Sequence, residues 1–206
     1  SDGSIYIAGS TSGDLDGQTN SGSSDAFISK YNVDGEKQWT RLLGTSDLED
    51  GFDLTTGSDG SIYVSGVTTG DLDDQTNSGS GDAFISKYNI DGEKQWTRLL
   101  GSSASDRANA LTTGSDGSIY IAGETNGDLD GQTNSGDSDA FISKYNVDGE
   151  KQWTRLLGSS STERAYALTT GSDGSIYITG SAEGDLDGQT NSGATDAFIS
   201  KYNPDG

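Results

Sequence analysis

The chain is one unit repeated along its length. The run Ser-Asp-Gly-Ser-Ile-Tyr begins at residues 1, 58, 115 and 172, a constant step of 57 residues, and the fourth copy ends after 35 residues at Gly206. A fixed period of several tens of residues is typical of solenoids, propellers and arrays, in which one unit cannot bury its apolar face alone. We therefore expect every copy to adopt the same structure and to pack on the next copy.

The composition excludes several classes of function. The formal net charge is −21, from 33 acidic and 12 basic residues, so no nucleic acid is expected as a partner, because phosphate binding needs a basic surface. The chain has no histidine and no cysteine, which excludes disulfides, thiolate or imidazole metal ligands, and catalytic triads built on those residues. No apolar run approaches the roughly 20 residues of a membrane span, so membrane insertion is not expected.

The apolar residues fall in short alternating runs separated by turn residues, a pattern typical of all-β proteins. In the second copy four runs predict strands, at residues 52–56, 61–65, 83–89 and 94–100. Asp-Gly dipeptides between runs predict tight hairpins. A long polar segment, residues 66–82, separates the second strand from the third.

The four predicted strands differ in their patterns. The second and third carry apolar groups on both faces, as strands covered on both sides do, whereas the fourth is charged and suits an outer edge. Four such antiparallel strands describe a β-propeller blade. We therefore predict an all-β chain, a single β-propeller repeat region over residues 1–206 built from 57-residue four-stranded antiparallel blades, with blades at about 1–44 (partial), 51–101, 108–158 and 165–206 (partial).

The runs SDGSIYIAG, DAFISKYNVDGEKQWTRLLG and ALTTGSDGSIYI resemble the bacterial β-propeller repeat family called SBBP, for seven-bladed β-propeller. The resemblance extends over the whole chain and every copy. It implies a propeller in an exported or cell-surface bacterial protein, so the expected location is extracellular or at the cell surface. The family supplies no catalytic residues to carry over.

The copies do not add up to whole blades. The predicted order gives 14 strands, with one inner strand missing at the start and one outer strand missing at the end, a deficit of 57 − 35 = 22 residues. The chain is then a window on a longer chain, or two copies associate into a ring of about seven or eight blades. A four-bladed ring with one imperfect blade and an open twisted array are further alternatives. The expected partners are other copies of the chain or the rest of a longer chain.

The polar segment of each copy carries the pattern D-x-D-G-x-x-N. Carboxylates two residues apart point the same way, the glycine lets the backbone turn, and the asparagine adds a neutral oxygen, and such hard oxygen ligands suit calcium. The sequence therefore predicts calcium as the single cofactor. The candidate ligands are Asp14, Asp16, Asn20, Asp71, Asp73, Asn77, Asp128, Asp130, Asn134, Asp185, Asp187 and Asn191.

The same residues have a second interpretation. The pattern departs from D-x-D-x-D-G calcium loops at the first ligand position, it lacks the bidentate glutamate of an EF-hand, and the second copy has Asp74 in place of the glycine. Aspartate, asparagine and glycine are also the ordinary residues of turns, where side chains bond to nearby backbone. The alternative is a loop held by such turns, with Leu15 tucked onto the blade.

Aromatic and basic residues recur at fixed places. The tryptophans at 39, 96 and 153 are expected to fill the space between neighbouring blades, although a tryptophan can also stack on a sugar ring. The tyrosines at 6, 63, 120 and 177 are expected in the core between blades. The lysines at 30, 87, 144 and 201 are expected either to pair with the loop carboxylates or to lie in solvent.

These patterns predict a non-catalytic scaffold or interaction module, because every acidic pair is repeated in copy after copy and no single tuned acid and base stands out. The alternatives are a multivalent carbohydrate-binding propeller and a fibre-forming or adhesive repeat, so protein or glycan ligands are further candidate partners. The copies differ mainly at 10–12, 67–69, 124–126 and 181–183, and in the links 45–52, 102–109 and 159–166. We expect these segments to form exposed rims.

Overall fold

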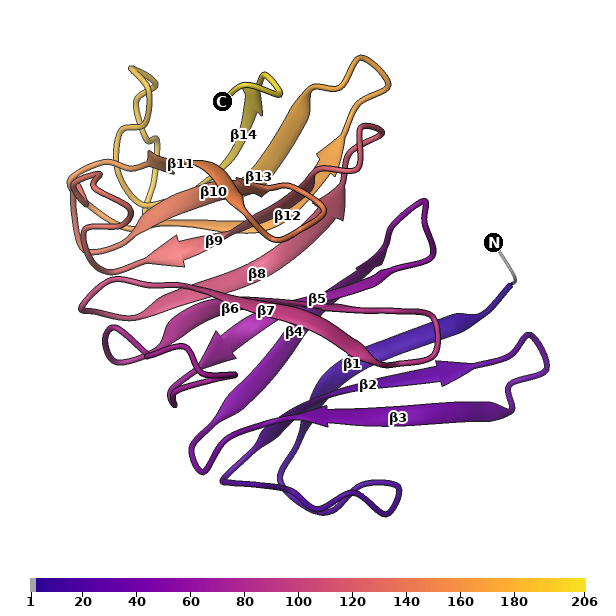
Figure 1. Ribbon diagram of the computed structural model, residues 1–206. Helices are drawn as coiled ribbons and strands as arrows, with labels where there is room; N and C mark the ends of the chain where they lie inside the picture. Colours follow the sequence, from indigo (N-terminus) through magenta and orange to yellow (C-terminus); the bar gives the residue numbers. More distant parts are fainter. Residues whose placement is uncertain (1–2) are drawn as a thin grey trace.

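The computed structural model describes residues 3–206, and Ser1 and Asp2, with which the first copy begins, lie outside the described residues. In the described part, 14 strands form four antiparallel sheets of three, four, four and three strands. Figure 1 shows the sheets stacked in one row from the N-terminal blade to the C-terminal blade. The predicted all-β fold, the strand number and the order within each blade are confirmed.

Each sheet is one blade, and neighbouring strands in it follow the order of the chain. Blade 1 contains β1 (Ile5–Thr11), β2 (Asp25–Tyr31) and β3 (Lys37–Leu43). Blade 2 contains β4 (Glu49–Thr56), β5 (Ile62–Thr68), β6 (Asp82–Tyr88) and β7 (Lys94–Leu100). Blade 3 contains β8 (Asp106–Thr113), β9 (Ile119–Thr125), β10 (Asp139–Tyr145) and β11 (Lys151–Leu157). Blade 4 contains β12 (Glu163–Thr170), β13 (Ile176–Ala182) and β14 (Asp196–Tyr202).

The inner strands are longer than their sequence pattern predicts. Strand β4 begins at Glu49, three residues before the predicted start, and its pairing with β5 shifts register between Gly51 and Asp53. The extra residue at the bulge, Phe52, breaks the alternation of apolar and polar positions. The predicted strand at 52–56 therefore covers β4 only from the bulge residue onward.

The hydrophobic core is divided into one cluster for each junction between blades. At the first junction, Ile28 of blade 1 packs with Ile62 and Val64 of β5, and these side chains are 3%, 0% and 1% exposed. The predicted core tyrosines Tyr63 and Tyr120 are buried at the next two junctions. Each blade is therefore stabilised mainly by its neighbours, as the repeat period predicts.

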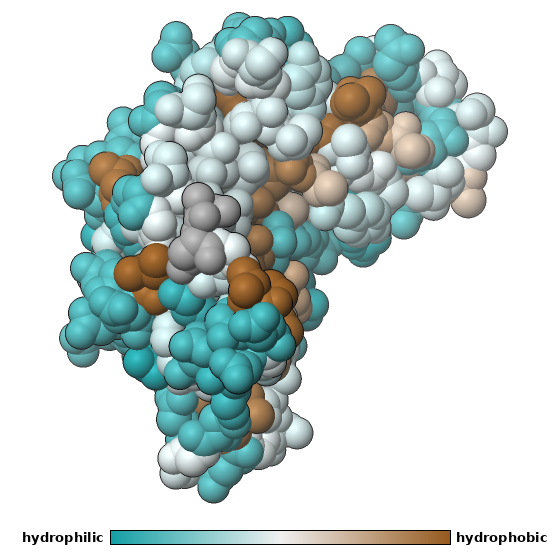
Figure 2. Space-filling view, turned by 90° about the vertical axis from the view of Figure 1, so that its right-hand side faces the viewer, coloured by the Kyte–Doolittle hydropathy of each residue, from teal (hydrophilic) through white to brown (hydrophobic). Residues whose placement is uncertain are grey.

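The row of blades is open at both ends. Ile5 in blade 1 is 49% exposed and Ile199 in blade 4 is 70% exposed, whereas the equivalent Ile62 and Ile142 inside the row are 0% exposed. Figure 2 shows a mostly hydrophilic surface on which hydrophobic residues form a few small patches. Within residues 3–206, no helix is long and apolar enough to cross a membrane.

Candidate functional site

The acidic loop of each copy folds into a small hairpin. In the third copy Leu129 and Gln132 exchange two backbone hydrogen bonds of 2.9 and 3.0 Å. Asp130 and Gly131 between them have φ values of 54° and 76°, which matches a two-residue turn with both central residues left-handed. Leu129 is buried against the blade, as predicted for Leu15, which is itself half-buried.

The first aspartate and the asparagine of the pattern hold the base of this hairpin. Asp128 Oδ1 accepts a hydrogen bond from the Asn134 backbone N–H at 2.9 Å. Asn134 donates from Nδ2 to the Thr125 carbonyl at 3.0 Å and accepts from the Gly136 N–H at Oδ1. The same contacts recur for the pairs Asp14 and Asn20, Asp71 and Asn77, and Asp185 and Asn191.

The second aspartate of the pattern fastens the hairpin to the outer strand of its own blade. Lys151 of β11 donates to Asp130 Oδ1. Burial by itself would raise the pKa of Asp130, but the hydrogen bonds from Lys151 and Thr154 outweigh that effect and hold the pKa below its usual value. Gln132 adds a hydrogen bond from Nε2 to the Thr154 carbonyl at 2.6 Å and accepts one from the Leu156 N–H at 3.3 Å.

This arrangement separates the predicted calcium ligands by role. Asp128 and Asn134 bind turn backbone, while Asp130 faces a lysine, and across residues 3–206 no three carboxylates converge on one point. An ion bound to Asp130 would have to displace the Lys151 ammonium group. Calcium binding by these loops therefore stays a prediction, while the hydrogen bonds that hold the alternative turn structure are present in every copy.

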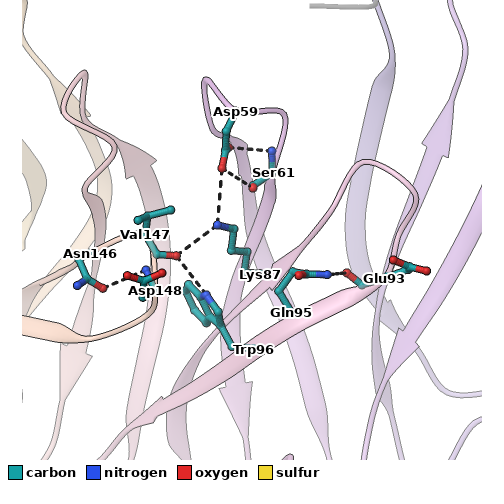
Figure 3. Close-up of polar contacts among 9 residues, drawn as sticks. All are labelled: Asp59, Ser61, Lys87, Glu93, Gln95, Trp96, Asn146, Val147 and Asp148. Atoms are coloured by element: carbon teal, nitrogen blue, oxygen red, sulfur yellow. Dashed lines mark hydrogen bonds and ion pairs between the residues drawn. The ribbon is translucent and has the colours of Figure 1, made fainter.

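A second group of recurring residues joins each blade to the next (Figure 3). At the junction of blades 2 and 3, Trp96 Nε1 and Lys87 Nζ both donate to the Val147 carbonyl, at 3.2 and 3.3 Å. Lys87 also lies 3.6 Å from a carboxylate oxygen of Asp59, which Ser61 fixes through two hydrogen bonds. We call this set, with Arg98 and the turn at residues 146–149, the blade clasp.

Arg98 and Gly149 complete the blade clasp. Arg98 Nε donates to the Gly149 carbonyl at 2.8 Å, and its guanidinium lies 5.4 Å from the centre of the Trp96 ring. Gly149 has a φ of 77°, and a Cβ atom there would lie 2.9 Å from Cδ2 of Trp96. The predicted packing of the tryptophans between blades is therefore confirmed.

The lysines pair with different carboxylates from those expected. The third-strand lysines Lys87 and Lys144 lie near Asp59 and Asp116 in the tight turns, and the loop aspartates pair instead with Lys37, Lys94 and Lys151 of the outer strands. The spacing Lys-x-x-Thr did not indicate this pairing, because residues three apart in a regular strand point to opposite faces. A bulge between the lysine and the tryptophan of each outer strand brings both donors to one face.

Buried carboxylates between blades are a feature that the sequence analysis missed. Asp82 at the start of β6 and Asp106 at the start of β8 are 1% and 0% exposed, and Oδ1 of each has no hydrogen-bond partner among the described residues. Burial raises the pKa of Asp82, and the nearby Asp106 carboxylate raises it further. An aspartate that follows a polar loop resembles the residues of that loop, so the sequence does not indicate that it is buried.

The variable segments form narrower rims than predicted. Val67 and Thr68 are buried at the end of β5, and of residues 67–69 Thr69 alone is exposed. The same third position is exposed in the other copies, at Ser12, Asn126 and Glu183. In blades 2, 3 and 4 this third position is the one exposed residue of the variable segment after the second strand, and in blade 1 Ser10 is exposed as well.

Comparison with known proteins places this geometry in a family. The family model described as a beta-propeller repeat, SBBP, matches residues 95–130, which run from β7 to the hairpin of the third copy. The equivalent stretches lie one period away on either side, at 38–73 and 152–187. The chain contains the SBBP beta-propeller repeat. The matched stretch contains most of the outer strand β7 of blade 2 and the strands β8 and β9 of blade 3, and it therefore spans the junction between these two blades.

The curated relatives are much longer than this run of SBBP repeats. The regulatory protein FlaEY of Caulobacter vibrioides is 32% identical over 203 residues, which cover 88% of this chain and 21% of the relative. The uncharacterized WD repeat-containing protein L264 of Acanthamoeba polyphaga mimivirus is 24% identical, over 78% of this chain and 14% of its own length. A solved structure of a protein of unknown function from Bacteroides caccae aligns with a TM-score of 0.43 at 8% identity, over 87% of this chain and 57% of that chain.

Proposed function

We propose that this run of SBBP repeats is a non-catalytic scaffold or interaction module that acts outside the cell or at its surface. The observation that carries the proposal is the recurrence of the blade clasp. The indole N–H groups of Trp39, Trp96 and Trp153 donate to the carbonyl groups of Ile90, Val147 and Pro204 at 3.3, 3.2 and 3.2 Å. The recurring polar groups hold one blade on the next, which is the chemistry of a scaffold.

The exposed rim supports a role in binding. The clasp and hairpin residues are nearly the same in every copy, with Asp74 for glycine in one hairpin and Ile90, Val147 or Pro204 at the clasp carbonyl. The exposed rim residue differs in each copy, being Ser12, Thr69, Asn126 or Glu183. A scaffold that presents different side chains on a constant frame has this distribution of sequence. The name of one relative, a regulatory protein, is compatible with such a role.

A graft of a short epitope tests the scaffold proposal. We expect a six-residue epitope inserted after Asn126 to leave the melting temperature within a few degrees of the parent and to be bound by its antibody. The matched control inserts the same epitope after Asp148, inside the clasp turn, where it should unfold the junction. Unfolding by the rim insertion would contradict the proposal, as would enzymatic turnover retained by the purified chain.

A groove beside the clasp favours carbohydrate binding as a second candidate. It encloses about 270 Å³ between blades 2 and 3 and is lined by Asp59, Tyr63, Asp116 and Asn146, a mixture of aromatic and polar groups that suits a small polar ligand. A glycan array separates the two candidates. Binding that is lost in both Trp96→Ala and Asn146→Ala would favour the lectin, and an array without signal would favour the scaffold.

Two further proposals concern assembly and calcium. For a fibre-forming or adhesive repeat, the particle size measured by light scattering should grow with protein concentration, whereas a single sharp species argues against such a repeat.

If calcium pins the hairpins, a chelator should lower the melting temperature, and Lys151→Gln should strengthen the effect of added calcium because the competing ammonium group is gone. An unchanged melting temperature in both proteins would reject calcium.

A further inference from the structure

The junction of blades 2 and 3 encloses two carboxylates side by side. The Asp106 backbone N–H donates to the Gly81 carbonyl at 2.8 Å, so the start of β8 lies beside the start of β6, where Asp82 stands. Both side chains also lie against one link between the blades. A Cβ atom added to Gly101 would overlap the Asp82 carboxylate, and the next residue, Ser102, donates from its backbone N–H to Asp106 Oδ2 at 2.6 Å.

One oxygen of each carboxylate is buried without a partner among the described residues. Asp82 Oδ2 accepts from the Ser78 N–H and Asp106 Oδ2 accepts from Ser102, but Oδ1 of both has no hydrogen bond. Neither carboxylate forms an ion pair within residues 3–206. A buried ionised carboxylate needs hydrogen bonds or an opposite charge to offset its lost hydration. This pair therefore calls for a positive charge that the described chain does not supply.

The other two junctions satisfy the second carboxylate completely, because it belongs to a glutamate. Glu49 accepts at Oε1 from the hydroxyl groups of Thr45 and Thr68, at 2.8 and 2.7 Å, and at Oε2 from the Thr45 N–H. Glu163 likewise accepts from Ser159 with both oxygens. The unpaired second carboxylate is thus particular to the junction of blades 2 and 3.

Asp106 leaves a gap because it is one methylene group shorter than glutamate. Its register partner in β9 is Thr125, the equivalent of Thr68, and the Thr125 hydroxyl donates to the Gly127 carbonyl and forms no hydrogen bond with Asp106. Oδ1 of Asp82, Oδ1 of Asp106 and the hydroxyl of Thr125 are hard oxygen ligands of the kind that calcium prefers. Two carboxylates also match the charge of a divalent cation.

A pocket of about 230 Å³ leads from the surface to the first carboxylate. Its wall includes Asp82 and Gly101 and, from blade 3, Asp130, which is paired with Lys151. Such a pocket supplies an entry path and the water molecules that complete a calcium coordination shell. The net charge of −21 raises the concentration of cations around the whole chain.

We propose that the junction of blades 2 and 3 binds one calcium ion between Asp82 and Asp106, with the Thr125 hydroxyl and water as further ligands. The site is separate from the acidic hairpins, whose aspartates bond to turn backbone and to lysines. Its two carboxylates come from different blades, so the bound ion fastens blade 2 to blade 3. The inference goes beyond the scaffold proposal, because it names a ligand and the junction that the ligand stabilises.

A calcium titration of the whole chain, first freed of metal with a chelator, tests the inference. We expect calorimetry to show one ion bound per chain and the melting temperature to rise with calcium, because an ion that binds only the folded chain stabilises it. The diagnostic variant is Asp106→Glu, which keeps the charge but introduces the residue found at the other two junctions. It should weaken calcium binding by about tenfold or more, because the longer side chain takes up the hydrogen bonds seen at Glu49 and Glu163.

A second variant gives a change of sign that a purely structural role does not predict. Asp82→Asn should raise the melting temperature in chelator, where it removes an uncompensated charge, and should lower it relative to the parent in saturating calcium, where it removes a ligand. The matched control Asp91→Asn removes the same charge from an exposed turn of blade 2 and should respond to calcium as the parent does. Circular dichroism verifies that each variant is folded.

Two results overturn the inference. One is a parent chain that neither binds calcium in the calorimeter nor melts later in its presence. The other is an equal response to calcium in the parent and in folded Asp106→Glu, which assigns any bound ion to the hairpins instead. Neither result touches the scaffold proposal, because the epitope graft tests that proposal without calcium.

Discussion

At the scale of single residues, Asp74 occupies a position that favours glycine. Its φ is 62°, and it stands where the other copies have Gly17, Gly131 and Gly188. Left-handed backbone costs a residue with a Cβ atom about 1 kcal/mol relative to glycine. We therefore predict that Asp74→Gly raises the free energy of unfolding by about 0.5–1 kcal/mol, measured by urea denaturation. The control Asp91→Gly removes the same charge at a residue without positive φ, and an equal gain there would contradict the backbone explanation.

The buried Asp82 makes stability depend on pH. Because its folded-state pKa is raised, the folded chain holds this proton more tightly than the unfolded chain does, and the contribution of Asp82 to stability falls as pH rises through the usual carboxyl range. Two groups act on the Asp82 carboxylate: the backbone N–H of Ser78, which donates to Oδ2, and the nearby carboxylate of Asp106. We predict that Asp82→Asn stabilises the chain at pH 7 by about 1–3 kcal/mol and that this gain shrinks at pH 4. Thermal melts at both pH values check this, and a gain independent of pH would exclude a buried charge as its cause.

At the scale of elements, the blade clasp depends on a glycine that touches a tryptophan. Gly149 and Gly131 have nearly the same φ, 77° and 76°, but a Cβ atom at Gly149 would lie 2.9 Å from Trp96, whereas one at Gly131 would meet nothing within 4 Å. Both alanine substitutions strain the backbone, and Gly149→Ala also overpacks the junction. We predict that Gly149→Ala destabilises the chain by about 1–3 kcal/mol more than Gly131→Ala, measured as the difference between their urea midpoints. Equal losses would show that the clasp turn can move away from the indole ring.

The elements also show which features the sequence can predict. Strands bounded by clear turn residues were located closely: the predicted strand at 83–89 lies within one residue of β6, and the predicted outer strand at 94–100 coincides with β7. The start of β4 was misplaced because the bulge at Phe52 interrupts the alternation, and the hairpin within the acidic loop was missed although Asp-Gly lies at its turn. The ion pair between Asp73 and Lys94 was missed because it joins residues that are 21 positions apart. Alternation reports on a single strand, whereas a partner on another element depends on the packing of the blade.

At the scale of the whole molecule, the row of blades behaves as a one-dimensional array. Separate apolar clusters occupy the junctions, and the inner strands are linked directly, for example by the hydrogen bond from the Leu111 N–H to Asp53 Oδ2 at 2.7 Å. Stability in such an array is close to a sum of blade terms and nearest-neighbour interface terms. The loss of a terminal blade therefore removes one interface and leaves the other interfaces intact.

We predict that a chain ending at Thr162, which lacks blade 4, still unfolds in one cooperative transition with a lower urea midpoint. Removal of blade 4 uncovers Tyr120 and Ile142, which are 1% and 0% exposed in the full row, so blade 3 loses part of its buried apolar surface while blades 1 and 2 keep theirs. The slope of the free energy of unfolding against urea should also fall, because it scales with the surface exposed on unfolding. The matched truncation at the other end starts at Glu49 and removes blade 1. Complete unfolding of both truncated chains in buffer would show that the four blades are stable only as one unit.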